Sequence, residues 1–168
     1  IKKQVELGNI EIENFEKLKL GPNSCNLTLG EKLIVYTSLP LDMKKDNPTA
    51  EIVIPSTGLL LEPNKLYLGH TNERTYTKTY VPMLEGRSSI GRLGMDIHVT
   101  AGFGDIGFNG RWTLEIRVTE PLIVYPYIDV CQIYFHTIEG DCELYKSDKY
   151  QNSETVTSSR LWKELIQW

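Results

Sequence analysis

Short segments with the composition of β-strands recur along almost the whole chain, and turn-forming residues separate them. The segments are residues 24–29, 32–36, 51–54, 59–61, 67–71, 76–81, 97–100, 112–118, 122–124 and 129–136. Glycine and proline fill the gaps between them, as at Gly21-Pro22 and Glu120-Pro121. Many short strands with turns between them are typical of a β-sandwich, a jelly roll or a barrel. We therefore expect a mainly β fold.

Helical patterns are confined to three short places, residues 2–7, 88–93 and 160–167. Gly8 and Gly94 end the first two. The third follows Ser158 and Ser159, which are candidate N-cap residues, and it has one apolar face. Such a terminal helix should dock on the body of the protein or on a neighbouring copy.

The composition favours one folded domain over residues 1–168, because 40% hydrophobic residues are enough to form a core at this length. A net charge of −4 provides no basic field for a nucleic-acid polymer. The chain has no apolar run long enough to span a membrane and no signal-peptide core, so we expect a cytoplasmic protein.

The cysteines Cys25, Cys131 and Cys142 are odd in number and widely spaced. This spacing favours buried free thiols in a reducing compartment over a disulfide or a metal site. Zinc nucleobase deaminases carry HxE and PCxxC motifs, and neither motif occurs in this sequence. We therefore expect no zinc.

Polar residues that can carry chemistry concentrate between positions 85 and 116. Arg87, Ser88, Ser89 and Arg92 lie at a short helical turn, where backbone N–H groups, hydroxyls and guanidinium groups together can hold phosphate oxygens. A capped helix that carries surface arginines explains the same residues without any ligand. The residues alone leave both interpretations open.

Two further features of this segment have a structural and a functional interpretation. Asp105 is surrounded by Gly102, Gly104 and other glycines, which allow a ligand to approach the backbone closely or simply form a tight hairpin. Glu115 alternates with apolar neighbours, so it should lie on the polar face of a strand. In the structural interpretation, Glu115 forms a solvated ion pair on that face. In the functional interpretation, it lines a pocket in which partial desolvation raises its pKa towards that of a general base.

Several motifs, taken together, resemble the dCTP deaminase family. They are Glu-Gly-Arg-Ser-Ser-Ile-Gly-Arg-Leu-Gly at 85–94, His-Val-Thr-Ala-Gly-Phe at 98–103, Gly-Phe-Asn-Gly at 107–110 and Thr-Leu-Glu-Ile at 113–116. Their order and spacing are similar to those of the family. The resemblance extends to Gly-Pro-Asn-Ser at 21–24 and to Lys-Tyr-Gln at 149–151.

The resemblance implies a distorted β-barrel or jelly roll of the dUTPase-like type with a few short helices. It also implies a homotrimer whose active sites form between neighbouring subunits, and a C-terminal flap and terminal helix at residues 145–168. The implied activity is zinc-independent hydrolytic deamination of dCTP at C4 of cytosine. The products are dUTP and ammonia, and the reaction supplies dUTP or dUMP for thymidylate synthesis.

The resemblance also implies a role for particular residues. Glu115 corresponds to the general base, and Ser88 and Arg92 correspond to residues that position the water and stabilise developing charge. The implied substrate contacts are Arg87 and Ser89 at the triphosphate, Asp105 at the deoxyribose 3′-hydroxyl, His98, Thr100 and Ala101 around the base and water, and Lys149 and Tyr150 on the flap. Mg²⁺ is expected on the nucleotide phosphates rather than in a protein cage.

Two alternatives remain at this stage. A bifunctional dCTP deaminase/dUTPase would release dUMP and pyrophosphate, and Gly102 resembles the residue of bifunctional members. A catalytically weak nucleotide-binding regulator is suggested by Asn26, where many relatives have aspartate, and by an atypical sequence after residue 151. In that stretch, Glu154 would repel phosphate if its side chain pointed inward.

Overall fold

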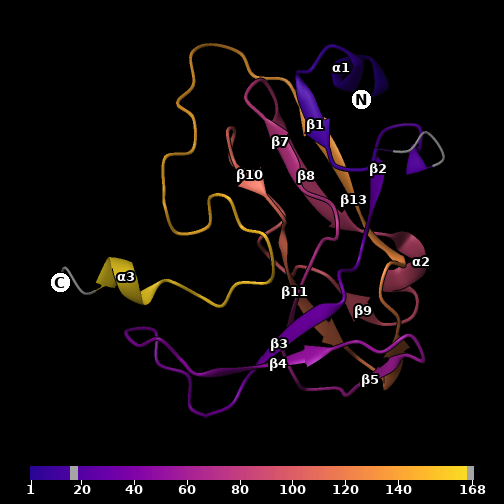
Figure 1. The fold of residues 1–168 in the computed structure, drawn as a ribbon, viewed down its shortest axis with the longest axis vertical. Helices are drawn as coiled ribbons and strands as arrows, with labels where there is room; N and C mark the ends of the chain where they lie inside the picture. The colour runs from indigo at the N-terminus through magenta and orange to yellow at the C-terminus, as the bar shows by residue number, and fades with distance from the viewer. Residues whose placement is uncertain (16–18, 166–168) are drawn as a thin grey trace.

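The computed structural model describes residues 1–15 and 19–165, which form a mainly β fold (Figure 1). The strands are β1 (Ile10–Ile12), β2 (Cys25–Thr28), β3 (Lys32–Tyr36), β4 (Thr49–Val53), β5 (Leu59–Leu61), β6 (Tyr67–His70), β7 (Thr75–Thr77), β8 (Val81–Gly86), β9 (Met95–Asp96), β10 (Asn109–Gly110), β11 (Thr113–Val118), β12 (Leu122–Val124) and β13 (Asp129–His136). The helices are α1 (Lys2–Glu6), α2 (Ser88–Gly91) and α3 (Trp162–Leu165).

The described strands form small sheets whose order differs from their order in the chain. The largest has the order β4-β3-β6-β11-β9, and three-stranded sheets have the orders β1-β7-β10 and β2-β13-β8. β5 pairs with β12 in a further antiparallel ribbon. The C-terminal segment then leaves β13 and runs along one side of the fold to α3, whereas α2 lies at the opposite side (Figure 1).

One hydrophobic core joins these sheets. β11 contributes Leu114 and Ile116, and β13 contributes Cys131 and Ile133; all four are fully buried. Their alternation with more exposed neighbours follows the two-residue period of a strand. The core therefore fixes which side chains of β11 face outward, and this decides the position of Glu115.

The prediction of one strand over residues 76–81 was wrong, because the chain turns between β7 and β8. The hydroxyl of Thr77 accepts hydrogen bonds from the backbone N–H groups of Thr79, at 3.2 Å, and Tyr80, at 3.3 Å. Such side-chain-to-backbone bonds compete with strand pairing. β8 then contains Pro82, which is tolerated because β8 lies at the edge of its sheet, with β13 on one side and the loop at residues 102–104 bonded to its other edge.

The strand predicted at residues 97–100 was also wrong. The pairing with β11 is made by β9, whose Asp96 and Met95 lie opposite Arg117 and Val118. One further bond follows, from the N–H of Glu115 to the carbonyl of Ile97 at 2.8 Å. Beyond it the chain leaves this sheet as a loop that bonds to the free edge of β8, and we call its residues 99–108 the glycine loop.

The predicted helices are present but shorter, and the part of the third that extends past residue 165 lies outside the described residues. Burial of Cys25 and Cys131 confirms the prediction for these two thiols, and burial raises the pKa of Cys25 to about 11. The prediction was wrong for Cys142, which is exposed because its segment has no regular structure. Within the described chain, no helix has the length and apolar character needed to span a membrane.

Candidate active site

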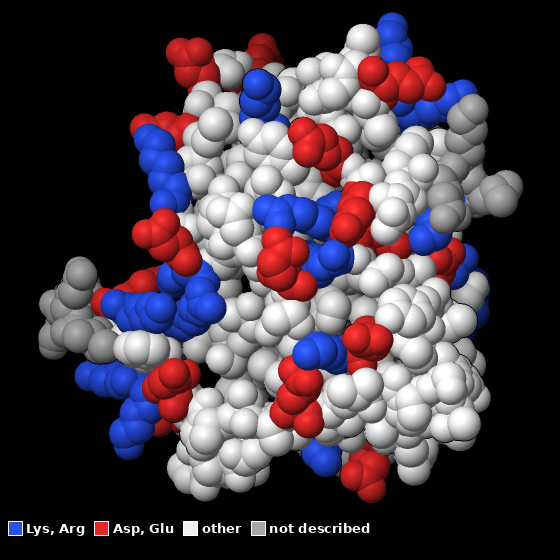
Figure 2. Space-filling view, viewed as in Figure 1, with Lys and Arg blue, Asp and Glu red and all other residues white. Residues whose placement is uncertain are grey.

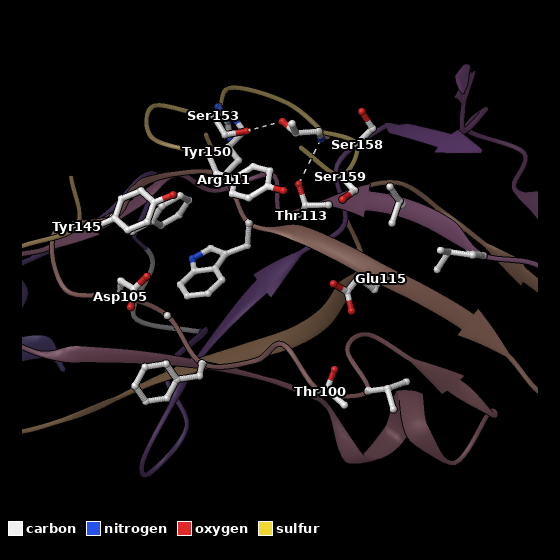
Figure 3. A pocket seen from close by; sticks show the side chains of 18 of the residues that line it. Thr100, Asp105, Arg111, Thr113, Glu115, Tyr145, Tyr150, Ser153, Ser158 and Ser159 are labelled. Carbon is white, nitrogen blue, oxygen red and sulfur yellow. Dashed lines mark hydrogen bonds between the residues drawn. The ribbon is translucent and has the colours of Figure 1, made fainter. Parts of the chain in front are cut away.

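The outward face of β11 forms the floor of a pocket. Leu114, Ile116 and Val118 point into the core, whereas Thr113 and Glu115 are half-buried on the opposite face. This confirms the alternation expected from the sequence. Figure 3 shows the Glu115 carboxylate pointing into the cavity between Thr113 and Thr100.

The pocket has a volume of about 630 Å³ and is enclosed by three parts of the chain. The glycine loop forms one wall, and residues 145–159 of the C-terminal segment cover the other side. Tyr36, Leu66 and Leu68 add an apolar end. A mostly apolar cavity with a few converging polar groups is the usual form of a small-molecule site.

His98 lies directly beneath Glu115. Its Nδ1 is 3.8 Å from Glu115 Oε2, which is too long for a direct hydrogen bond, and only 7% of the His98 side chain is exposed. His98 nevertheless holds the pKa of Glu115 below its ordinary value, and burial opposes this effect without overcoming it. Desolvation acts in the expected direction, but the net shift of the Glu115 pKa is downward rather than the predicted rise, so the side chain is a carboxylate at neutral pH.

The glycine loop can approach the core only because Gly102 and Gly104 lack side chains. A Cβ atom on Gly102 would lie 2.3 Å from the carbonyl oxygen of Leu84, and one on Gly104 would lie 2.1 Å from the ring of Trp112. The close fit places Asp105 at the pocket, near Tyr145 (Figure 3). Atoms of Leu84 and Trp112 occupy the space beside these two glycines, so their geometry serves the packing of the loop, and the approach of a ligand to their backbone stays a prediction.

The C-terminal segment is held against β10 by a set of paired hydrogen bonds. The side chain of Gln151 accepts from the N–H of Asn109 and donates to the carbonyl of Gly107, both at 2.8 Å. The N–H of Asn152 donates to the carbonyl of Asn109 at 2.7 Å, and the N–H of Arg111 donates to the carbonyl of Ser153 at 2.8 Å. Residues 150–159, which we call the cover segment, are thus built onto the pocket.

Glu154 points away from the pocket, because it forms an ion pair with Arg74. Arg74 also donates to Asn109 Oδ1 at 2.7 Å and to Asn152 Oδ1 at 2.9 Å. The side chain of Arg74 thereby connects β10 to the cover segment. The repulsion of phosphate expected for an inward Glu154 does not arise in this arrangement.

The structure brings together only part of the predicted site. Thr100, Asp105, Glu115 and Tyr150 line the pocket, and His98 supports its floor. Lys149 is adjacent in sequence but pairs with Glu164 of α3. Ala101 is exposed on the glycine loop and does not line the pocket.

The remaining predicted residues, Arg87, Ser88, Ser89 and Arg92, lie at α2 and do not line this pocket. Figure 1 shows α2 on the opposite side of the fold from α3. Within the described residues, the arginine-serine turn therefore lies outside the pocket that contains Glu115.

Sequence reasoning missed Arg111, which also lines the pocket. Its side chain is 18% exposed and its Nη2 pairs with Glu13 at 2.9 Å, while Nη1 is buried without a hydrogen-bond partner among the described residues. Arg111 lies two residues before Thr113 and four before Glu115, so the alternation of β11 puts all three side chains on the same face. That parity was the signal that could have found Arg111.

Comparison with known proteins places the chain in a family. The family model described as dCTP deaminase-like matches residues 1–138. The chain belongs to the dCTP deaminase-like family. It is 60% identical over 157 residues to "dCTP deaminase, dUMP-forming" of Clostridium beijerinckii, covering 94% of this chain and 91% of the relative. The protein of the same name from Leptospira biflexa is 58% identical, covering 94% and 90%.

A solved structure confirms the fold of this family member. The 2′-deoxycytidine 5′-triphosphate deaminase of Agrobacterium tumefaciens superimposes with a TM-score of 0.63 at 20% identity, covering 81% of this chain and 46% of that one. The match shows that the expected dUTPase-like, mainly β architecture with few short helices is correct.

Proposed function

We propose that this protein is an enzyme that deaminates dCTP and then releases dUMP and pyrophosphate. The observation that carries the proposal is the ionised Glu115 on the floor of a half-open pocket, in a chain 60% identical to a dUMP-forming dCTP deaminase. The sequence alone favoured dUTP as the product. The names of the relatives favour the alternative, dUMP.

In the proposed deamination, Glu115 takes a proton from a water molecule whose oxygen bonds to C4 of cytosine. The C4–N4 bond then breaks, and Glu115 returns its proton to the leaving nitrogen, so that ammonia departs. The second proton of the water ends on N3 of the uracil product. His98 supports this role because it keeps Glu115 ionised and therefore able to accept the first proton.

We propose that a neighbouring copy completes the site. Ser88 and Arg92 would position the water and stabilise the charge that develops on the ring, but they do not line the pocket that contains Glu115 of their own chain. The exposed apolar side chains of Leu93, Val99 and Phe103 flank these two groups and suit burial against another subunit. The homotrimer expected from the resemblance provides such an arrangement.

The sugar and phosphates would extend from the base towards the cover segment. Asp105 accepts a hydrogen bond from the 3′-hydroxyl in this proposal, and Tyr150 lies close to the phosphates. Lys149 reaches the phosphates only after it leaves Glu164. Arg87 and Ser89 would come from the neighbouring copy.

A magnesium ion fits this site only together with the nucleotide. The described residues contain no group of three or more His, Cys, Asp or Glu side chains that could hold a metal ion. Mg²⁺ is commonly held by substrate phosphates and a few protein oxygens. We propose that it neutralises the triphosphate and that Asp105 and Glu115 act on the nucleoside.

The experiment that tests the proposal is product analysis after incubation of the purified protein with dCTP and Mg²⁺. Release of ammonia, dUMP and pyrophosphate is expected, and Glu115→Gln should bind dCTP but release no ammonia, since it lacks the base. Accumulated dUTP would leave deamination correct and refute the second step. Tight nucleotide binding without turnover would identify a regulator and refute the enzyme.

A further inference from the structure

The start of β13 brings together residues from β2, from β13 itself and from the position that follows β8. β13 lies between β2 and β8, and Asp129 is its first residue. The register shifts between Asp129 and Cys131, whose partners on β2 are the consecutive residues Thr28 and Leu27. A shift of this kind is a β-bulge, and bulges commonly redirect a side chain next to a site.

Asp129 contacts a residue on each side of this bulge. On the β2 side, Asn26 Nδ2 donates to Asp129 Oδ2 at 2.9 Å. On the β8 side, Arg87 Nη1 donates to the carbonyl oxygen of Asp129 at 3.0 Å and lies 3.8 Å from Asp129 Oδ2. The side chains of Arg87 and Asp129 are 34% and 28% exposed, so water screens this pair only partly.

These contacts leave one edge of Arg87 free. A guanidinium group has five N–H donors in a rigid plane, and two of its nitrogens together can hold two phosphate oxygens. Nη1 is used by Asp129, while Nε and Nη2 have no hydrogen-bond partner among the described residues. A fixed Nη1 therefore orients the Nε and Nη2 edge.

We propose that Asp129 is a positioning residue for the triphosphate of the substrate. Its carbonyl group and its carboxylate, held in place by Asn26, fix Arg87 so that the free guanidinium edge faces the phosphates. Asp129 itself makes no contact with the substrate. This inference rests on the proposed function, because it needs a nucleotide triphosphate as the ligand of Arg87.

The alternative is that the carboxylate of Asp129 hinders phosphate binding through like charge. The two possibilities predict opposite changes when the carboxylate is removed. If Asp129 positions Arg87, its removal weakens dCTP binding. If it repels the phosphates, its removal strengthens dCTP binding.

The test is a double-mutant cycle on the dissociation constant of dCTP, measured by calorimetry with Mg²⁺ present. Asp129→Ala should raise the constant about three- to fivefold, as expected for the loss of a partly screened ion pair, while the bond from Arg87 to the backbone carbonyl at this position remains. Asn26→Ala should have a smaller effect of the same sign. Asp141→Ala, which removes an exposed aspartate from an irregular segment, should leave the constant unchanged.

The same Asp129→Ala change in an Arg87→Ala background should alter the constant less than about twofold, because no guanidinium remains to be positioned. For Asp129→Ala alone, the rate at saturating dCTP should stay near that of the parent chain. Weakening of equal size in both backgrounds would show a merely structural role and overturn the inference, as would tighter binding by Asp129→Ala.

Failure of the inference can be told apart from failure of the proposed function. Turnover of dCTP by the unaltered protein decides the function. If turnover occurs and Arg87→Ala binds dCTP as the parent does, the phosphate role of Arg87 is wrong and the inference falls with it, while deamination stands.

Discussion

The cover segment should loosen when Arg74 is replaced by glutamine. The side chain of Arg74 connects β10 to this segment through Asn109, Asn152 and Glu154, in addition to the bonds of Gln151. The backbone bonds between the two parts remain in the variant. Arg74→Gln therefore tests how much of the closed arrangement depends on the side chain.

The size of the effect follows from the exposure of the partners. Glu154 is 64% exposed, so its ion pair contributes little. The bond from Arg74 to Asn152 is a charged hydrogen bond, and the two contacts together should stabilise the closed segment by about 1.4 kcal/mol. That value corresponds to a rise of about tenfold in the population of the open segment.

Amide hydrogen exchange measures this population. The N–H groups of Asn152 and Arg111, which bond across the two parts, should exchange about tenfold faster in Arg74→Gln. The amides of β13 report global unfolding and serve as an internal control. Lys78→Gln removes an exposed positive charge nearby and should change nothing. Unchanged exchange at Asn152 and Arg111 would refute the role assigned to Arg74.

Three further changes test other parts of the account. His98 holds the pKa of Glu115 down, so activity should be lost only as pH falls through that lowered value. His98→Asn should therefore move the acid limb of the kcat/KM profile to higher pH. An acid limb that stays in place refutes this role of His98. Glu164→Gln frees Lys149 and should lower KM for dCTP about twofold, whereas an unchanged KM contradicts the competition. Gly30→Ala places a Cβ atom 2.1 Å from the buried ring of His70 and should lower the free energy of unfolding by about 1–3 kcal/mol, as measured by thermal unfolding. A variant as stable as the parent protein refutes the close packing.

The sequence correctly predicted the strands in which the hydrophobic pattern and the pairing within the sheet cover the same residues. The bounds of β3, β5, β12 and β13 match the predicted ones, because apolar residues and turn signals mark both of their ends. The errors at residues 76–81 and 97–100 have local causes: hydroxyl bonds of Thr77 in one case, and the loss of strand partners beyond Ile97 in the other. Neither cause is visible in hydrophobic periodicity.

The site was predictable in its residue types but not in its electrostatics. The parity of β11 placed Glu115 on the correct face, yet the direction of its pKa shift depends on His98, which a long-range packing arrangement brings beneath it. The partners of Glu154 and Lys149 were likewise inaccessible, because they come from distant parts of the chain. Arg111 was missed although its parity was readable.

The central claim is that Glu115 of one copy and the α2 residues of another form one deamination site. Its most direct test mixes Glu115→Gln and Arg92→Ala chains, each inactive alone, by coexpression or joint refolding. Random mixing in a closed trimer should restore roughly a quarter of the parental ammonia release, because one interface in four would combine an intact Glu115 with an intact Arg92. No recovery from verified mixed trimers would contradict the shared site.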